Sequence, residues 1–248
     1  MLRSGLESSR LLRRSTVLPL LLAMTLALAA CGGVGVREEE ATWTPQPPKP
    51  TATPDIAAIF HNFIYPIAAG CLPESDTLMP NAPREYRGGV HEGVDFYDGD
   101  SCAKIELGTP ALAAKDGIVA RADSGYHELT QTELDTANQR ISEGGANDFE
   151  VIDLFRGRQV WIDHGNGIVT RYAHLSGIPP EIRQGARVAQ GQTIGLIGES
   201  GTPESLSDPG TELHLHWELR VGEAFLGGGL SPEEVRALYA GLFQPPPR

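Results

Sequence analysis

Hydrophobic positions between Val90 and Val221 fall into short runs rather than into the longer amphipathic repeats of helices. Three segments, 111–123, 158–174 and 192–200, are rich in β-branched and other apolar residues and are broken by Gly, Asn or Asp. Such runs are typical of strands joined by turns. The sequence DHGNG at 163–167 lies between two of these runs and predicts a hairpin. Because long helices do not alternate with the strands, the pattern predicts a mainly β domain with an antiparallel sheet and a few short helices.

Two segments with polar caps are predicted to be helical. Ser231 is followed by a proline and by the glutamate of a capping box, which predicts a helix continuing to Phe243. Thr130 begins a similar cap and predicts a helix running toward Ser142. That second helix lies inside residues 126–158, a polar insertion much longer than a common hairpin connection. The insertion either lines a groove of the domain or is a neutral surface addition, and we favour the first.

The amino-terminal residues have the pattern of an export signal. Arginines precede an apolar run from Val17 to Ala30. As a helix this run would rise only about 21 Å, short of the roughly 30 Å hydrocarbon core of a membrane. We therefore expect residues 1–30 to be a signal peptide. The sequence LAAC at 28–31 resembles a bacterial lipobox, which would make Cys31 the lipidated first residue of the mature protein; an ordinary signal with a coincidental cysteine is the alternative.

The segment after this cysteine has a different composition. Residues 31–53 are rich in proline, threonine and charge and poor in large apolar side chains, so they are predicted to be an extended tether. We expect the folded domain to occupy residues 54–248 and to begin with a short helix from Asp55 to Phe63. Two cysteines of an exported protein are more often paired than free, so Cys71 and Cys102 are candidates for a disulfide.

The charge of the chain excludes one class of partner. The formal net charge is -12, and the basic residues do not form a stripe. Binding to the phosphates of nucleic acid depends on clustered Lys and Arg side chains. We therefore expect no nucleic-acid partner.

Histidines near the two ends of the β region are the candidate metal-binding and catalytic residues. Within the strand-like sequence GTELHLHWELRV, alternation places His214 and His216 on one face, about 6.6 Å apart. They can serve one metal centre, either as two ligands or as one ligand and one base. His91 and Asp95 would lie about 13 Å apart on a straight strand, too far for one metal, but Gly93 permits a bend that brings them together. Imidazole and carboxylate ligands with an open position are typical of catalytic zinc.

Four separated segments carry a family resemblance. GVHEGVDF, IDHGNGIVTRYAHLS, VAQGQTIGLIGESG and HLHWELR occur in this order and resemble the lysostaphin-like (LytM-type) zinc metallopeptidases. The resemblance implies the duplicated hybrid β motif of that family. It also implies that zinc is bound by His91, Asp95 and His216, that His214 is the general base, and that His174 stabilises the charge of the tetrahedral intermediate.

The resemblance covers residues 90–221 and implies an enzyme that cuts peptide bonds of bacterial cell-wall peptidoglycan. Such an enzyme would act outside the cytoplasm, attached to a membrane through Cys31. Two alternatives are a non-catalytic envelope module that binds or activates other cell-wall hydrolases and an anchored scaffold that binds a partner. The first is disfavoured because such modules lack ligands that this chain has. Thr202–Glu212, which is longer and more acidic than the family pattern, and the insertion 126–158 leave the specificity open.

Overall fold

The computed structural model describes residues 60–243, which lie within one compact unit, Ala52–Arg248. The expected signal peptide, lipidation site and tether lie outside the described residues. The helix expected from Asp55 to Phe63 falls mostly outside them too, and its described end, 60–63, is not helical. No helix within residues 60–243 has the length and apolar character needed to cross a membrane.

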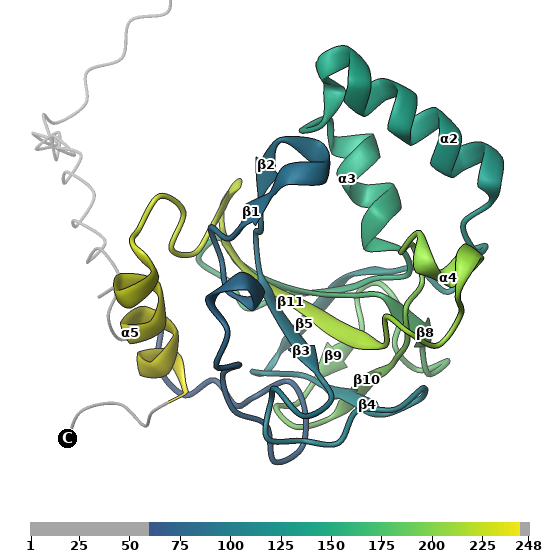
Figure 1. The fold of residues 1–248 in the computed structure, drawn as a ribbon. Helices are drawn as coiled ribbons and strands as arrows, with labels where there is room; N and C mark the ends of the chain where they lie inside the picture. The colour runs from purple at the N-terminus through teal and green to yellow at the C-terminus, as the bar shows by residue number, and fades with distance from the viewer. Residues whose placement is uncertain (1–59, 244–248) are drawn as a thin grey trace, which may run out of the picture. The chain divides into compact units, whose positions relative to one another are not determined.

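The main sheet is antiparallel, as the alternating pattern predicts (Figure 1). It has seven strands. Six follow the order β12-β11-β7-β6-β5-β9, and the seventh, β3, also pairs with β11. Their bounds are β3 Val94–Tyr97, β5 Gly117–Ala122, β6 Val160–Asp163, β7 Ile168–Ala173, β9 Arg187–Val188, β11 His214–Val221 and β12 Ala224–Phe225. The predicted hairpin at 163–167 joins β6 to β7, whose residues pair from Val160 with Tyr172 to Asp163 with Val169.

Smaller elements surround this sheet. A three-stranded sheet has the order β4-β10-β8, and β1 pairs with β2 in a short hairpin. The bounds of these strands are β1 Pro83–Arg84, β2 Gly89–Val90, β4 Pro110–Leu112, β8 Leu175–Gly177 and β10 Thr193–Ile197. The helices are η1 Asp76–Leu78, η2 Glu85–Arg87, α2 Gln131–Arg140, η3 Ile141–Gly145, α3 Phe149–Arg156, α4 Glu204–Ser207 and α5 Pro232–Leu242. Short helices in a mainly β domain confirm the predicted fold class.

Both predicted capping boxes form. Thr130 accepts a hydrogen bond from the backbone of Glu133 at the start of α2, and the side chain of Glu133 returns one to the backbone of Thr130. Ser231 and Glu234 make the same exchange at the start of α5. The insertion 126–158 folds as α2, η3 and α3, and the two longer helices, α2 and α3, lie beside the sheet (Figure 1).

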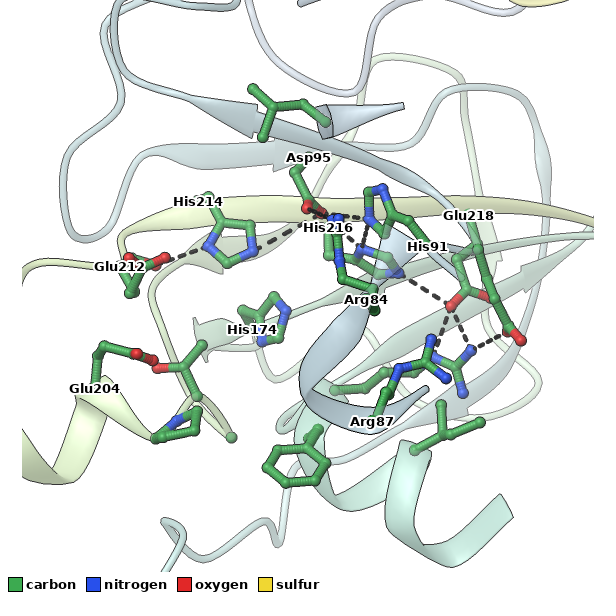
Figure 2. A pocket seen from close by; sticks show the side chains of 18 of the residues that line it. Arg84, Arg87, His91, Asp95, His174, Glu204, Glu212, His214, His216 and Glu218 are labelled. Atoms are coloured by element: carbon green, nitrogen blue, oxygen red, sulfur yellow. Dashed lines mark hydrogen bonds and ion pairs between the residues drawn. The ribbon is translucent and has the colours of Figure 1, made fainter. Parts of the chain in front are cut away.

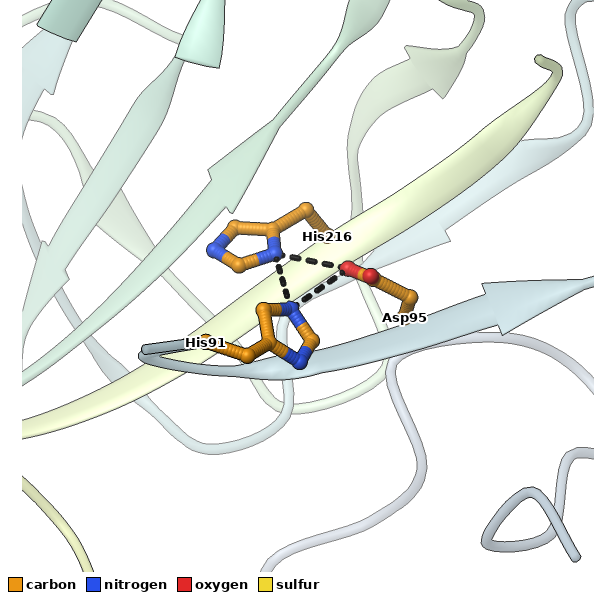
Figure 3. Close-up of side chains that lie close together, drawn as sticks. All are labelled: His91, Asp95 and His216. Atoms are coloured by element: carbon orange, nitrogen blue, oxygen red, sulfur yellow. Dashed lines mark hydrogen bonds and ion pairs between the residues drawn. The ribbon is translucent and has the colours of Figure 1, made fainter. Parts of the chain in front are cut away.

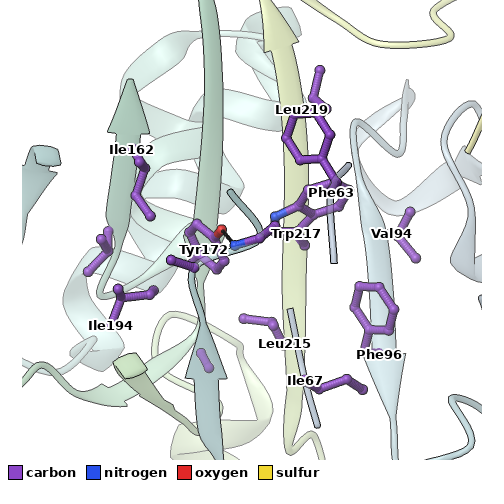
Figure 4. Close-up of a cluster of buried hydrophobic side chains, with 14 of the residues drawn as sticks. Phe63, Ile67, Val94, Phe96, Ile162, Tyr172, Ile194, Leu215, Trp217 and Leu219 are labelled. Carbon is purple, nitrogen blue, oxygen red and sulfur yellow. Dashed lines mark hydrogen bonds between the residues drawn. The ribbon is translucent and has the colours of Figure 1, made fainter. Parts of the chain in front are cut away.

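Strand β11 separates the hydrophobic core from a polar face. Its odd-numbered residues Leu215, Trp217 and Leu219 are fully buried in the core (Figure 4). Phe63 and Tyr239 meet the Trp217 ring edge-on there. Its even-numbered residues point the other way, and the alternation predicted from the sequence is confirmed. Those residues are polar but also buried, because other elements cover them: His214, His216, Glu218 and Arg220. The candidate site is built on this polar row.

The expected disulfide is present. Cys71 and Cys102 are joined, with their Cα atoms 5.4 Å apart. The bond links the segment that precedes β1 to the loop that follows β3. It therefore ties together the two chain segments that flank His91 and Asp95.

Candidate metal centre

Three side chains from β3, the residues just before it and the adjacent strand β11 meet at one point (Figure 3). Asp95 lies on β3 directly opposite His216 on β11, and His91 lies just before β3. Asp95 Oδ1 is 2.7 Å from His216 Nδ1 and 3.0 Å from His91 Nε2, and the two ring nitrogens are 3.0 Å apart. All three residues are buried. The structure thus brings together the three residues that the sequence analysis proposes as metal ligands.

Hydrogen bonds on the far side of each ligand determine which atoms face inward. His91 Nδ1–H donates to the carbonyl oxygen of Met79 at 3.1 Å. His216 Nε2–H donates to Glu218 Oε1 at 3.1 Å. Because neither acceptor carries a proton, each ring in its neutral form would turn a lone pair toward Asp95 Oδ1. The other carboxylate oxygen of Asp95, Oδ2, accepts a hydrogen bond from Arg84 Nη2 at 3.0 Å.

This donor set fits a zinc ion. Three lone pairs that converge within 2.7–3.0 Å repel one another unless a proton or a metal cation lies between them. The separations are close to the roughly 3.3 Å expected between ligand atoms of tetrahedral zinc. Two imidazoles and one carboxylate are also a typical catalytic ligand set, which leaves one position open. His91, Asp95 and His216 are therefore the residues that would hold the metal.

Charge at the triad supports the same conclusion. Burial raises the pKa of Asp95, but the neighbouring imidazoles of His91 and His216 outweigh it, so that this pKa lies well below its usual value. Burial lowers the pKa of His216, yet Asp95 and Glu218 outweigh it and raise that pKa to about 9. The protein without metal therefore attracts a proton to the place where a cation would bind, and metal binding would displace this proton.

The bend between His91 and Asp95 occurs where the sequence predicts it. A Cβ atom added to Gly93 would lie 2.5 Å from the backbone oxygen of Trp217 and 2.9 Å from a ring carbon of His216. Only glycine fits there, because the chain before β3 passes directly over β11. This close approach brings the side chain of His91 to Asp95, in place of the distance of about 13 Å that a straight strand would give.

Two further imidazoles lie beside the triad (Figure 2). His214 Nδ1–H donates to the carbonyl oxygen of Glu212 at 2.7 Å, and its Nε2 lies 3.9 Å from Asp95 Oδ1. His174 Nδ1–H donates to the carbonyl oxygen of Ser200 at 2.9 Å, and its ring centroid lies 4.4 Å from that of His214. Both rings therefore carry a lone pair on Nε2.

Both of these histidines are held in the neutral form. Burial lowers the pKa of His214, although Asp95 opposes this. The pKa of His174 lies well below its usual value, chiefly because the ring is buried and also because positive charge on His214 or His216 would repel its proton. Neutral imidazoles that each offer a lone pair beside a metal centre can accept protons during a reaction.

The groups that support the triad were not predicted from the sequence. Glu218 is fully buried behind His216, and Arg84 holds Asp95. A signal for Glu218 was available, because it stands two residues after His216 and so shares its face of β11. No comparable signal exists for Arg84, which reaches Asp95 from another chain segment. Glu92, which follows the ligand His91 in the sequence, accepts hydrogen bonds from Arg156 and Arg220.

A groove with a volume of about 670 Å³ opens over the triad (Figure 2). The insertion contributes to its wall, which supports the groove-lining alternative over the neutral one. The segment Thr202–Glu212 contributes as well, with Glu204 and Glu212, while Arg84 and Arg87 line it from the β1–β2 region. Arg87 Nη1 also donates to Asn147 Oδ1 of the insertion at 3.3 Å. The two departures from the family pattern thus both border the groove.

An antiparallel β domain with a buried His-Asp-His triad and two neutral imidazoles beside a groove is an arrangement typical of metal-dependent hydrolases. The sequence profile of Peptidase family M23 matches residues 89–226. The chain belongs to this family, which confirms the resemblance carried by the four sequence segments.

Two curated relatives match the same region. The peptidoglycan DD-endopeptidase ShyC of Vibrio cholerae is 30% identical over 132 residues, which are 53% of this chain and 20% of ShyC. The peptidoglycan DD-endopeptidase ShyA of the same organism is 31% identical over 139 residues, which are 56% of this chain and 22% of ShyA. The matched region thus spans about a fifth of the length of these relatives.

Solved structures that match this chain have lower sequence identity to it than these two relatives have. A zinc-containing peptidase from Vibrio cholerae is 22% identical, with 67% of this chain and 39% of that chain covered and a TM-score of 0.43. The catalytic domain of lysostaphin from Staphylococcus simulans is 21% identical, with 71% and 90% covered and a TM-score of 0.38.

Proposed function

We propose that this protein is a zinc-dependent endopeptidase that hydrolyses peptide bonds of bacterial peptidoglycan. The convergence of the His91, Asp95 and His216 lone pairs, next to two neutral imidazoles in one groove, is the observation that carries the proposal. Membership of a peptidase family supports hydrolysis of a peptide bond. The names of the two relatives, both peptidoglycan DD-endopeptidases, support peptidoglycan as the substrate.

Individual residues of the chain have separate roles in the proposed hydrolysis. A zinc ion bound by the triad would supply Lewis acidity, which acidifies water and polarises a carbonyl. His214 takes the proton of the attacking water at Nε2, because its Nδ1–H is already donated to Glu212 and Nε2 faces the triad. The protonated His214 then donates this proton to the leaving amine.

His174 has a second role in this scheme. In its neutral form Nε2 carries a lone pair, because Nδ1–H is donated to Ser200. It can therefore stabilise a developing oxyanion only after Nε2 takes up a proton. In its neutral form His174 is thus a second proton acceptor near His214, and a donor role toward the oxyanion would require the ring proton to be on Nε2 rather than on Nδ1.

The alternative is a non-catalytic module that binds or activates other cell-wall hydrolases. It requires a site that has lost part of its machinery, whereas here the three ligand candidates and both imidazoles face one groove. An anchored scaffold that binds a partner is compatible with catalysis, and a pull-down with the intact protein tests for such a partner.

Incubation of the zinc-loaded protein with purified peptidoglycan tests the proposal. We expect soluble fragments whose masses correspond to cleaved peptide bonds. They should disappear with a chelator and return when zinc is restored. A folded, zinc-loaded protein that releases no fragments would instead support the non-catalytic alternative. Mass spectrometry of the fragments would also identify the bond that is cut.

We further propose that the protein is an extracytoplasmic lipoprotein anchored through Cys31. The sequence LAAC at 28–31, preceded by a short apolar run, supports this proposal. Cys31→Ser removes the thiol that would carry the lipid, so we expect the variant to move from the membrane fraction to the soluble fraction. Cell fractionation and immunoblotting measure this. A variant that remains in the membrane fraction would show that another segment holds the protein there.

A further inference from the structure

Five charged side chains form an ionic cluster on the polar face of β11, beneath the metal ligands: Glu92, Arg156, Arg171, Glu218 and Arg220. Glu218 is completely buried at its centre. Glu92 Oε2 accepts from Arg156 Nη2 at 2.7 Å and from Arg220 Nη1 at 2.6 Å. Buried charges of this kind need partners on every side, so each position in the cluster depends on the others.

The two oxygens of Glu218 have different partners. Oε1 accepts from Arg156 Nε at 2.6 Å and from His216 Nε2 at 3.1 Å. Oε2 accepts from Arg220 Nη1 at 3.1 Å and lies 3.5 Å from Arg171 Nη1. The oxygen that orients the ligand His216 is therefore the one that Arg156 holds. The other oxygen is held from within the sheet.

Arg156 comes from a different part of the chain than the rest of the site. It is the last residue of α3, at the end of the insertion, and its side chain is only 7% exposed. Its backbone oxygen accepts the N–H of His174 at 2.9 Å. The next residue, Gly157, has φ +64, and a Cβ there would lie 2.1 Å from the backbone oxygen of Ser200, so the chain at this point is fixed against its surroundings.

We propose that Arg156 is a positioning residue that couples the insertion to the metal centre. Its guanidinium fixes the carboxylate of Glu218, which holds His216 Nε2–H so that Nδ1 faces His91 and Asp95. The proposal rests on the zinc site of the proposed function but not on cleavage. Without Arg156, the negative charge of Glu218 is still balanced by Arg220 and Arg171, which contact Oε2. Its Oε1, however, loses the arginine that holds it against His216. Groups behind a metal ligand commonly alter metal affinity about 10- to 100-fold.

A purely charge-balancing role would have a different signature. Lysine keeps the positive charge but lacks the planar fork that reaches Glu218 and Glu92 together. If Arg156 only neutralised Glu218, Arg156→Lys would bind zinc as tightly as the unaltered protein. If its geometry positions Glu218, the lysine variant should bind zinc more weakly than the unaltered protein and more tightly than Arg156→Ala.

The test measures zinc affinity by competition with a chromophoric chelator and the visible absorption spectrum of the cobalt-substituted protein. We expect Arg156→Ala to bind zinc at least about tenfold more weakly and to change the cobalt spectrum. The matched control is Arg140→Ala, which removes a half-exposed arginine of the same insertion whose acidic partners, Asp148 and Glu150, are both 3.7 Å away. This control should leave affinity and spectrum unchanged. Circular dichroism verifies that each variant is folded.

Each result of these measurements supports or refutes the positioning role of Arg156. Folded Arg156→Ala and Arg156→Lys with unaltered zinc affinity and cobalt spectrum overturn the proposal while leaving the metal centre intact. If Arg156→Ala does not fold, Arg156→Lys decides alone: weaker zinc binding supports the positioning role, and unaltered binding refutes it. An unaltered protein that binds no zinc removes the metal centre itself, and with it both this inference and the zinc-dependent function.

Discussion

Replacement of His216 by alanine is expected to abolish both zinc binding and the release of peptide fragments from peptidoglycan. His216 supplies one of only three ligand atoms in the candidate triad, and its Nδ1 lies within 3.0 Å of both others. With two ligands left, a His-Asp pair has too few donors for the three-ligand site that catalytic zinc requires. Zinc content after dialysis and fragment release measured by mass spectrometry are the two readouts.

The fold should survive this substitution, because the charges around His216 keep other partners. Asp95 retains Arg84, and Glu218 retains Arg156 and Arg220. His127→Ala is the matched control, since His127 is an exposed histidine of the insertion. The control should bind zinc and cleave normally. Cleavage by a folded, zinc-free His216→Ala protein would contradict the assignment of the triad.

Local patterns in the sequence account for much of the fold and part of the site. The alternation through His214 and His216 is a property of one strand, and the two capping boxes are contained within four residues each. These features need no knowledge of distant contacts. The hairpin at 163–167 is predictable for the same reason, because its turn residues and flanking runs are adjacent in the chain.

The supports of the metal centre depend instead on how distant segments pack. Arg156 and Glu218 are separated by 62 positions, and Asp95 and His216 by 121. No periodicity relates such residues, so their pairing follows from the register of β3 with β11 and from the course of the insertion. The two parts of the chain that depart from the family pattern, 126–158 and Thr202–Glu212, gave no residue-level prediction of how they would meet the groove.

The clearest division of roles concerns His214, whose replacement by alanine should leave zinc bound but nearly stop turnover. Its Nε2 lies 3.9 Å from Asp95 Oδ1, outside the closely packed triad, and its Nδ1–H is held by Glu212. It is thus placed to accept a proton rather than to bind the metal. Loss of a general base typically costs about 10²- to 10⁴-fold in rate, so kcat should fall by this factor while zinc content stays unchanged.

Comparison with His174→Ala and with the double variant shows whether the two imidazoles act in one step. Their ring centroids are 4.4 Å apart, close enough for both to serve the same reacting group. If they share one proton path, the double variant should be little slower than His214→Ala alone, because groups that act as a unit are not additive. Loss of zinc from His214→Ala would make this residue a ligand. If His214→Ala keeps its zinc and a near-normal kcat, His174 rather than His214 would be the general base.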